Sequence, residues 1–314
     1  MEFWRGTTGR VCLTNLKTRE SARSVDSMLN MNEPLLPKEA FTTFCDGLDH
    51  PEGLAFDCED HLWAGGELGQ IYRIDPQGHV SEITRLGGFC LGLTFSANQE
   101  LWVCNSGLHA MMRLDRSGSV LATIKEVNGT ELITPNFAVF DHKGNLYFTD
   151  SGHWDRANGH VYRLSSSGKA GHFAGPFAFA NGLAMSANDK YLFVAESQRD
   201  RVIRIPIRED LDAGENEIYA ENLARIPDGL ALDAGGNLYV TCYASDCIYR
   251  VAPDRSIQLL AFDPEGTRIA RPTNVAFGGP TFDDLYVANL GRWHIGKVRL
   301  GSVGQRLVNL ECRP

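Results

Sequence analysis

A set of short apolar strands separated by turn residues recurs six times along the chain, and no other feature restricts the possible folds as strongly. Each copy opens with a small apolar strand and continues through a turn rich in Gly, Asn or Asp to a strand with an aromatic residue. A third strand and another turn follow. The copies begin PEGLAFD at Pro51, CLGLTFS at Cys90, PNFAVFD at Pro135, ANGLAMS at Ala180, PDGLALD at Pro227 and PTNVAFG at Pro272. Segments such as HVSEIT supply a fourth strand, and a period of about 45 residues is typical of a propeller blade.

The repeat therefore predicts an all-β fold, a six-bladed β-propeller of four-stranded antiparallel blades. No long amphipathic helical pattern interrupts the repeat, which excludes α/β folds. The ring has to close, and either Phe41–Cys45 or Leu307–Leu310 can complete the last blade. Residues 1–38 are polar and show no clear period, so we expect a flexible N-terminal arm there, followed by the propeller at 39–314.

Charge and composition exclude several classes of partner. The formal net charge is −9 and the isoelectric point is near 5.5, whereas nucleic-acid binding requires a basic surface. No run of about 18 apolar residues predicts a membrane span. The eight cysteines show no metal-type spacing, so we expect buried free thiols and a reduced, cytoplasmic protein, with a Cys242–Cys247 disulfide across a hairpin as the alternative. The sequence does not indicate an oligomeric state.

One position of the repeat carries oxygen atoms in nearly every copy. Just before the G-L-A-F strand, the six copies read Glu52, Leu91, Asn136, Asn181, Asp228 and Asn274. Equivalent positions of a propeller lie at one height around its central channel. A single Asn or Asp before Gly is an ordinary turn residue. Five oxygen-bearing side chains that converge on one channel would remain unsatisfied without water or a cation, so the set favours a metal site over turns.

The type of ligand selects the metal. Carboxylate and amide oxygens suit hard cations, and Ca²⁺, which takes six to eight oxygens in loose geometry, fits best. Mg²⁺ and Mn²⁺ are alternatives, and Zn²⁺ is a further one that usually requires His or Cys ligands.

The phrases HPEGLAFD, NGLAMSANDKYLFVAES, PDGLALDAGGNLYV and PTNVAFGG resemble the senescence marker protein, regucalcin and gluconolactonase family over residues 47–300. The resemblance implies a six-bladed propeller with a divalent metal that hydrolyses lactones, often sugar-derived. It implies metal ligands at Glu52, Asn181 and Asp228, with Asn136 beside them and touching metal or substrate. Many members carry an arginine shortly before the third-repeat Asn, and this chain, which reads ELITPNFAVFD there, does not.

These residues predict a hydrolase that opens a lactone by metal-activated water. Asp228 is the candidate general base, with a role as ligand only as the alternative. Asn136 and Asn274 are candidate substrate contacts, as are His153 and Trp154 of the third-blade insertion SGHWDRANGH, since such loops often line a channel entrance. Two rival hypotheses stay open. One is an organophosphate or aryl-ester hydrolase at the same metal, and the other is a non-catalytic binding propeller.

Overall fold

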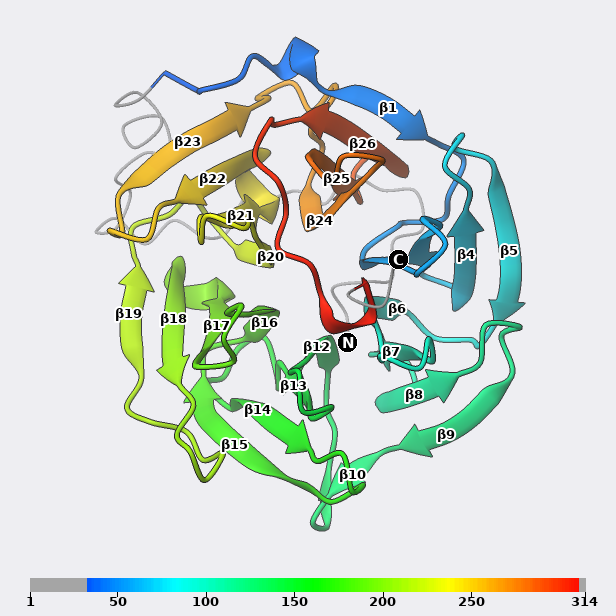
Figure 1. Cartoon of the computed structure of the whole chain (residues 1–314), viewed down its shortest axis with the longest axis vertical. Helices are drawn as coiled ribbons and strands as arrows, with labels where there is room; N and C mark the ends of the chain where they lie inside the picture. Colours follow the sequence, from blue (N-terminus) through cyan, green and yellow to red (C-terminus); the bar gives the residue numbers. More distant parts are fainter. Residues whose placement is uncertain (1–32, 311–314) are drawn as a thin grey trace.

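The computed structural model describes residues 33–310, and in them six four-stranded antiparallel sheets are arranged as blades around a central channel (Figure 1). The predicted six-bladed propeller is confirmed. Each blade is a meander, because turns of a few residues join neighbouring antiparallel strands. Residues 1–32 of the predicted arm lie outside the described part of the chain.

The blades follow the sequence repeats, and each begins with its strand nearest the channel. Blade 1 has β2 (Leu54–Phe56), β3 (Leu62–Gly65), β4 (Gln70–Ile74) and β5 (Val80–Arg85). Blade 2 has β6 (Cys90–Phe95), β7 (Leu101–Asn105), β8 (Ala110–Leu114) and β9 (Val120–Ile124). Blade 3 has β12 (Pro135–Phe140), β13 (Leu146–Asp150), β14 (Gly159–Leu164) and β15 (Ala170–Phe177). A hairpin of β10 (Glu126–Val127) and β11 (Thr130–Glu131) lies between blades 2 and 3.

The second half repeats the same order. Blade 4 has β16 (Ala180–Met185), β17 (Tyr191–Glu196), β18 (Arg201–Pro206) and β19 (Glu217–Ala220). Blade 5 has β20 (Pro227–Leu232), β21 (Leu238–Cys242), β22 (Cys247–Val251) and β23 (Ile257–Phe262). Blade 6 takes β24 (Pro272–Gly278), β25 (Asp284–Asn289) and β26 (His294–Arg299) from the end of the repeat region and β1 (Thr42–Cys45) from its start.

The ring is closed by the N-terminal segment, which is the first of the two predicted alternatives. Strand β1 pairs antiparallel with β26 and forms the outer strand of blade 6. Before β1, the amides of Leu35 and Leu36 donate to carbonyls of β23 in blade 5, and a 3₁₀ turn η1 (Lys38–Ala40) follows. One segment therefore binds both blades 5 and 6.

Aromatic residues of the repeat pack blade against blade. The aromatic of a second strand contacts the aromatic of the next blade's innermost strand edge-on. Ring centroids are 5.5 Å apart for Trp63–Phe95, 6.3 Å for Trp102–Phe140, 5.3 Å for Tyr239–Phe277 and 5.0 Å for Tyr286–Phe56. Such pairs typically add about 0.5–1.5 kcal/mol beyond the area that they bury. The recurring aromatic thus explains why the blades close into one ring.

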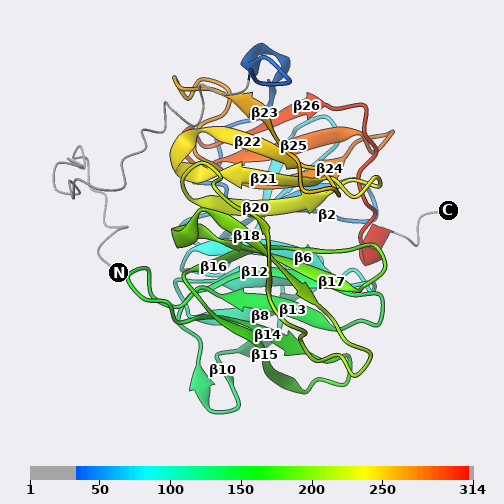
Figure 2. The same cartoon turned by 90° about the vertical axis from the view of Figure 1, so that its left-hand side faces the viewer.

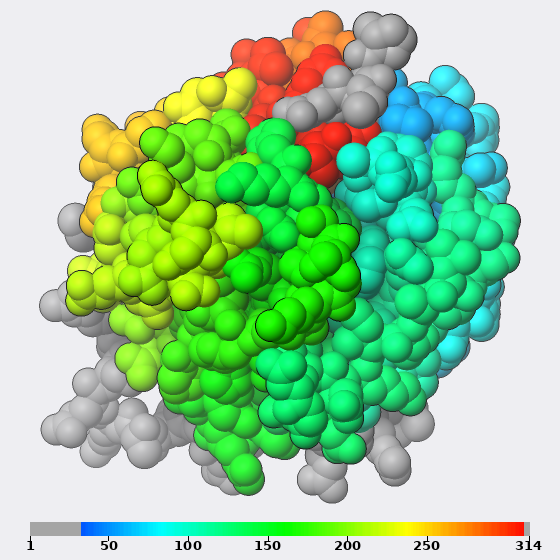
Figure 3. Space-filling view, turned by 60° about the horizontal axis from the view of Figure 1, so that its bottom comes forward, coloured from blue at the N-terminus to red at the C-terminus, as the bar shows by residue number. Residues whose placement is uncertain are grey.

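The C-terminal segment crosses one end of the channel instead of forming a strand. It runs over the centre of the ring in Figure 1, lies on one face in Figure 2, and ends in the 3₁₀ turn η4 (Val308–Leu310). Figure 3 shows its red atoms between cyan and green blades. We call residues 303–310 the tail and this end of the channel the tail face.

The remaining composition-based expectations concern cysteines and membranes. Cys242 and Cys247 are directly paired across β21 and β22, and both are free thiols, so the alternative of a disulfide is not realised. Within residues 33–310, no helix has the length and apolarity needed to cross a bilayer.

Candidate metal and substrate site

A bulge at the start of the innermost strands sets the direction of the predicted ligands. In blades 2 to 5 the pairing with the second strand skips from the first to the fourth residue, as between Pro227↔Cys242 and Leu230↔Val240. Two residues of the inner strand therefore oppose one residue of its neighbour, and such bulges re-aim side chains. Asn136, Asn181 and Asp228 are each the first residue of their bulge.

Contacts between successive blades bring these positions together in a ring. A Cβ on Gly53, Gly92 or Gly182 would collide with the carbonyl oxygen of Leu91, Asn136 or Asp228 in the next blade. Three threonine hydroxyls link further pairs of neighbouring blades at the same level. Thr149 donates to the carbonyl of Asn181 (2.9 Å), Thr241 to that of Thr273 (3.0 Å) and Thr273 to that of Glu52 (3.0 Å). Glu52, Asn136, Asn181 and Asp228 thus lie at one level around the channel.

The sixth member of the ring is Thr273, and the expected equivalence of Asn274 is wrong by one residue. The pairing Pro272↔Asn289 corresponds to Pro227↔Cys242, so Thr273 matches Asp228 and Asn274 matches Gly229. The repeat comparison followed the Asn instead of the proline, which marks the true register. The Asn274 side chain nevertheless lies beside blade 5, since a Cβ on Gly229 would contact its amide carbon at 3.2 Å.

The two carboxyls of the ring are buried at the top of an apolar channel. Glu52 and Asp228 are each 7% exposed, and the channel below them is lined by apolar residues such as Leu54, Leu183 and Leu230. Burial raises the pKa of Glu52 to about 8. Burial and then the charge of Glu52 raise the pKa of Asp228 well above its usual range, against a hydrogen bond from Asn181. A cation between the two carboxyls would oppose both effects.

The amides supply further oxygens for such a cation. The Oδ1 atoms of Asn136 and Asn274 are buried and have no hydrogen-bond partner among residues 33–310, although buried amide oxygens nearly always have one. Asn181 differs, because its Nδ2 donates to Ser197 Oγ at 3.2 Å, which orients the amide. Two carboxylates and several amide oxygens without His or Cys form a donor set that fits Ca²⁺. The assignment of these residues as ligands stays a prediction.

The mouth of the channel lies at the end opposite the tail face and is formed by loops. Trp154, in the loop after β13, is 38% exposed and packs edge-on against Phe179, with ring centroids 4.7 Å apart. It lines a pocket with Ser197, whose hydroxyl contacts Asn181. His153 is exposed and lies 3.2 Å from Asn158 Nδ2 through its Nδ1. Trp154 thus lines a pocket with a residue that contacts the ring, while His153 is engaged within its own loop.

Sequence reasoning missed the hydroxyls that hold the ring. Thr149 Oγ1 accepts from the amide of Phe137 (2.9 Å), and Thr241 Oγ1 accepts from that of Gly229 (2.8 Å). Ser197 Oγ donates to the Pro227 carbonyl at 2.6 Å. The repeated phrases LYFT and LYVT carried a signal for the two threonines, since both place a hydroxyl at the end of an otherwise apolar strand.

A second group of ionisable residues lies at the rim of blade 1. His50 Nδ1 is 2.8 Å from Asp49 Oδ1 and 2.9 Å from Glu67 Oε2, and Gln70 donates to Asp49 Oδ2 at 2.8 Å. These side chains satisfy one another and are partly exposed. This rim group therefore differs from the channel ring, where the buried Oδ1 of Asn136 has no partner within residues 33–310.

Comparison with known proteins identifies the family. The family model described as SMP-30/Gluconolactonase/LRE-like region matches residues 87–290. The chain belongs to this family.

Relatives within and near this family carry names of lactonases. The chain is 23% identical over 235 residues to a pentonolactonase of Haloferax volcanii, which covers 73% of this chain and 77% of the relative. It is 30% identical over 209 residues to a gluconolactonase of Zymomonas mobilis, which covers 58% of this chain and 57% of the relative. A solved gluconolactonase structure from Xanthomonas campestris superposes with a TM-score of 0.73 at 21% identity, over 83% of this chain and 89% of that one, and shows the same fold.

Proposed function

We propose that this protein is a calcium-dependent lactonase that hydrolyses a small, sugar-derived lactone. Membership of the SMP-30/gluconolactonase family supports lactone hydrolysis, as do the pentonolactonase and gluconolactonase names of its relatives. The observation that carries the metal is the ring itself, where the buried carboxyls of Glu52 and Asp228 lie at one level with the buried Oδ1 of Asn136, which has no partner within residues 33–310. Ca²⁺ fits this donor set best, with Mg²⁺, Mn²⁺ and Zn²⁺ as alternatives.

Glu52, Asn136, Asn181 and Asp228 would hold the ion. When bound, a divalent cation polarises the lactone carbonyl and stabilises the charge that develops on its oxygen. Hydrolysis adds a hydroxyl group to the acyl carbon and a proton to the departing ring oxygen. Asp228 accepts the proton of the attacking water as general base and passes it to the departing ring oxygen. The amides of Asn136 and Asn274 would orient the substrate, a role supported by their buried Oδ1 atoms, which lack partners within residues 33–310.

The mouth of the channel supplies the remaining substrate contacts. Trp154 offers an exposed aromatic face beside the ring, which suits the apolar face of a lactone or sugar ring. His153 lies on the same loop, where its amide donates to Asn158 Oδ1, and is the second candidate substrate contact at the channel mouth. The buried free thiols support a reduced, cytoplasmic location, and we propose no nucleic-acid or membrane partner.

The test is a pH-stat assay over sugar δ-lactones, γ-lactones and aromatic lactones, before and after EDTA treatment and with each metal restored. We expect hydrolysis of at least one lactone, its loss with EDTA and its recovery with Ca²⁺. Asp228→Asn should lower kcat by about 10²–10⁴-fold if Asp228 is the base, while Asp210→Asn, an exposed carboxylate in the β18–β19 loop, serves as the matched control. Full activity in Asp228→Asn would exclude Asp228 from the reaction.

The same assay separates the rival functions. A polarised phosphoryl group makes demands similar to those of a polarised carbonyl, so phosphotriesters and aryl esters belong in the panel. Faster turnover of these than of any lactone would favour the organophosphate or aryl-ester hydrolase. Metal binding without hydrolysis of any substrate would favour a non-catalytic propeller.

A further inference from the structure

A pocket beside the ring has no role in the proposed reaction, and its lining is chemically unlike the ring. Its residues come from three successive loops on the channel mouth: Trp154, Ser197, Gln198, Asp200, Arg225 and Ile226. Ser197 ties the pocket to the ring, because its hydroxyl contacts Asn181 Nδ2 (3.2 Å) and the carbonyl of Pro227 (2.6 Å), the residue before Asp228. Ser197 thus connects the pocket wall to the residues that hold the ring.

The backbone of the pocket is held in a costly conformation. Ile226 has a φ of 63°, and a β-branched residue in the left-handed region is a genuine outlier. Asp200 fixes this conformation, because its Oδ1 accepts from the amide of Ile226 at 2.9 Å. Such strain is concentrated at functional sites. The strained residue directly follows Arg225 and so determines where that arginine lies.

Arg225 is exposed, and among residues 33–310 its guanidinium makes no hydrogen bond or ion pair. Arginines elsewhere on the propeller are paired with carboxylates, as in Arg85–Glu82 (2.9 Å), Arg204–Glu217 (2.6 Å) and Arg299–Asp283 (2.9 Å). A guanidinium presents several donors in a planar fork that matches an oxyanion.

Further unpaired arginines lie along the same mouth. Arg268 and Arg271 in the β23–β24 loop and Arg292 in the β25–β26 loop form no ion pair within the described range of the chain. The nearby carboxylates are occupied by backbone amides, Asp200 by that of Ile226 and Asp246 by that of Arg271. Burial raises the pKa of both carboxyls, while the charge of Arg225 opposes that rise for Asp200 and the charge of Arg271 opposes it for Asp246. Each of these two arginines thus lies near a carboxylate without forming an ion pair with it among residues 33–310.

We infer that this pocket is a substrate subsite in which Arg225 binds an oxyanion substituent of the lactone, a carboxylate, phosphate or sulfonate, with Trp154 and Ile226 against the adjoining carbon atoms. The inference rests on the proposed lactonase function and names its substrate class. The ring carboxyls hold the cation, and the arginines of blades 5 and 6 attract the anionic end of the substrate. The two charged regions thereby fix the orientation of the lactone.

The test compares two sugar δ-lactones that differ only at the end remote from the carbonyl, one with a hydroxyl and one with a phosphate or carboxylate. We expect wild-type kcat/KM to be about tenfold higher for the anionic lactone, and Arg225→Gln to lower this ratio toward one, mainly through KM. Arg225→Lys should restore part of the ratio. Arg208→Gln, an exposed arginine on the tail face, should leave it unchanged. An unaltered ratio in Arg225→Gln would overturn the inference.

A binding measurement separates this inference from the lactonase proposal. Titration calorimetry measures the binding of two cyclic ethers, which are analogues of the two lactones without the reactive carbonyl. One ether carries the anionic group and the other does not. We expect the anionic ether to bind wild-type protein more tightly than Arg225→Gln, with an advantage that falls as salt rises. This result without hydrolysis of any lactone would remove only the proposed function. Equal binding of both ethers by wild-type protein would overturn the subsite even if lactones are hydrolysed.

Discussion

Asp263 shows how a single buried carboxylate can organise a loop at the channel mouth. Its side chain accepts hydrogen bonds from the amides of Thr267 (2.7 Å), Arg268 (2.5 Å) and Ile269 (3.1 Å). Burial alone would raise the pKa of Asp263, but these hydrogen bonds outweigh it and hold the pKa at about 2. The loop so fixed carries Arg268 and Arg271 and leads into Thr273 and Asn274.

Replacement of Asp263 by Asn should make the free energy of unfolding less dependent on pH. Because the pKa of the folded state lies below that of the unfolded chain, the ionised carboxylate stabilises the fold above about pH 4, and this contribution is lost as the pH falls toward about 2. Asp263→Asn should lower the free energy of unfolding by about 2 kcal/mol at neutral pH, with the difference from wild type vanishing in acid. Urea unfolding at several pH values measures it. A difference that is constant with pH would contradict this account.

Within a blade, the bulge and the hydroxyl opposite it form the structural element that aims the ring. Thr241 lies opposite the bulge of blade 5, where its Oγ1 accepts from Gly229 and donates to the Thr273 carbonyl of blade 6. Thr149 has the same two contacts between blades 3 and 4. One hydroxyl thus fixes both the bulge of its own blade and the position of the next.

Thr241→Val keeps the shape of the side chain and removes both hydrogen bonds. The buried amide of Gly229 then lacks its partner, which typically costs about 1–3 kcal/mol. We expect the free energy of unfolding to fall by that amount, and calcium affinity to fall with it because Asp228 precedes Gly229. Thr130→Val, an exposed position in β11, is the control for the substitution itself. Unchanged stability and calcium affinity in Thr241→Val would show that the bulge does not depend on this hydroxyl.

The strands and their turns could be predicted from the sequence, whereas the register of blade 6 and the pocket at Arg225 could not. Turn residues and recurring aromatics predicted six blades, because those residues directly determine strand ends and blade contacts. The same comparison placed Asn274 one residue out of register, since it matched the Asn and not the proline that aligns Pro272 with Pro227; the pairing of Pro272 with Asn289 shows where the bulge falls. The pocket at Arg225 had no signal in the repeat. It forms from loops of different blades, and no single repeat contains that arrangement.

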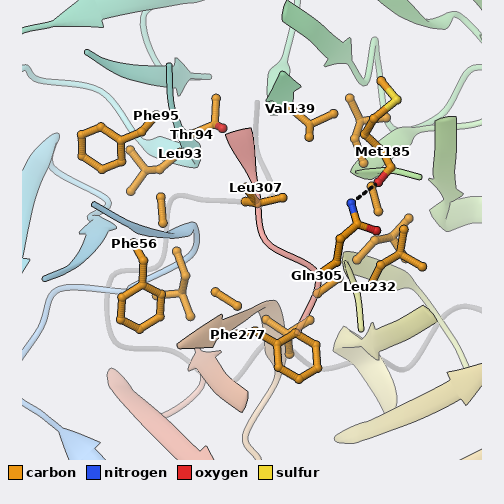
Figure 4. A pocket seen from close by; sticks show the side chains of 18 of the residues that line it. Phe56, Leu93, Thr94, Phe95, Val139, Met185, Leu232, Phe277, Gln305 and Leu307 are labelled. Atoms are coloured by element: carbon orange, nitrogen blue, oxygen red, sulfur yellow. Dashed lines mark hydrogen bonds between the residues drawn. The ribbon is translucent and has the colours of Figure 1, made fainter. Parts of the chain in front are cut away.

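At the scale of the whole molecule, two chain segments from opposite ends of the repeat hold the propeller together. Strand β1 completes blade 6. The tail bridges several blades across the tail face, because Asn309 Nδ2 donates to Phe56 O (2.8 Å), Gln305 Nε2 to Met185 O (2.9 Å) and Gln99 Nε2 to Asn309 O (2.8 Å). Figure 4 shows Gln305 and Leu307 among the apolar residues of a cavity of about 80 Å³ beneath the ring. The tail thereby closes this end of the channel with both polar and apolar side chains.

Asn309→Ala should destabilise the propeller without altering the metal ring directly. The substitution leaves the buried carbonyl of Phe56 without the Asn309 amide, so we expect the free energy of unfolding to fall by about 1–2 kcal/mol. Differential scanning calorimetry measures the shift in Tm, with the exposed Asn216→Ala as control. A Tm equal to that of wild type would mean that the tail does not clamp blade 1.

The metal site and the proposed reaction both require that the side chains of Glu52 and Asp228 hold one cation between them. Calorimetric titration of EDTA-treated protein with Ca²⁺ tests it most directly, with Glu52→Gln and Asp228→Asn beside the exposed control Glu209→Gln. We expect one Ca²⁺ per chain in wild type and in the control, and at least about tenfold weaker binding in each ring variant. Calcium binding that persists unchanged when both carboxylates are replaced would contradict the metal site and the reaction built on it.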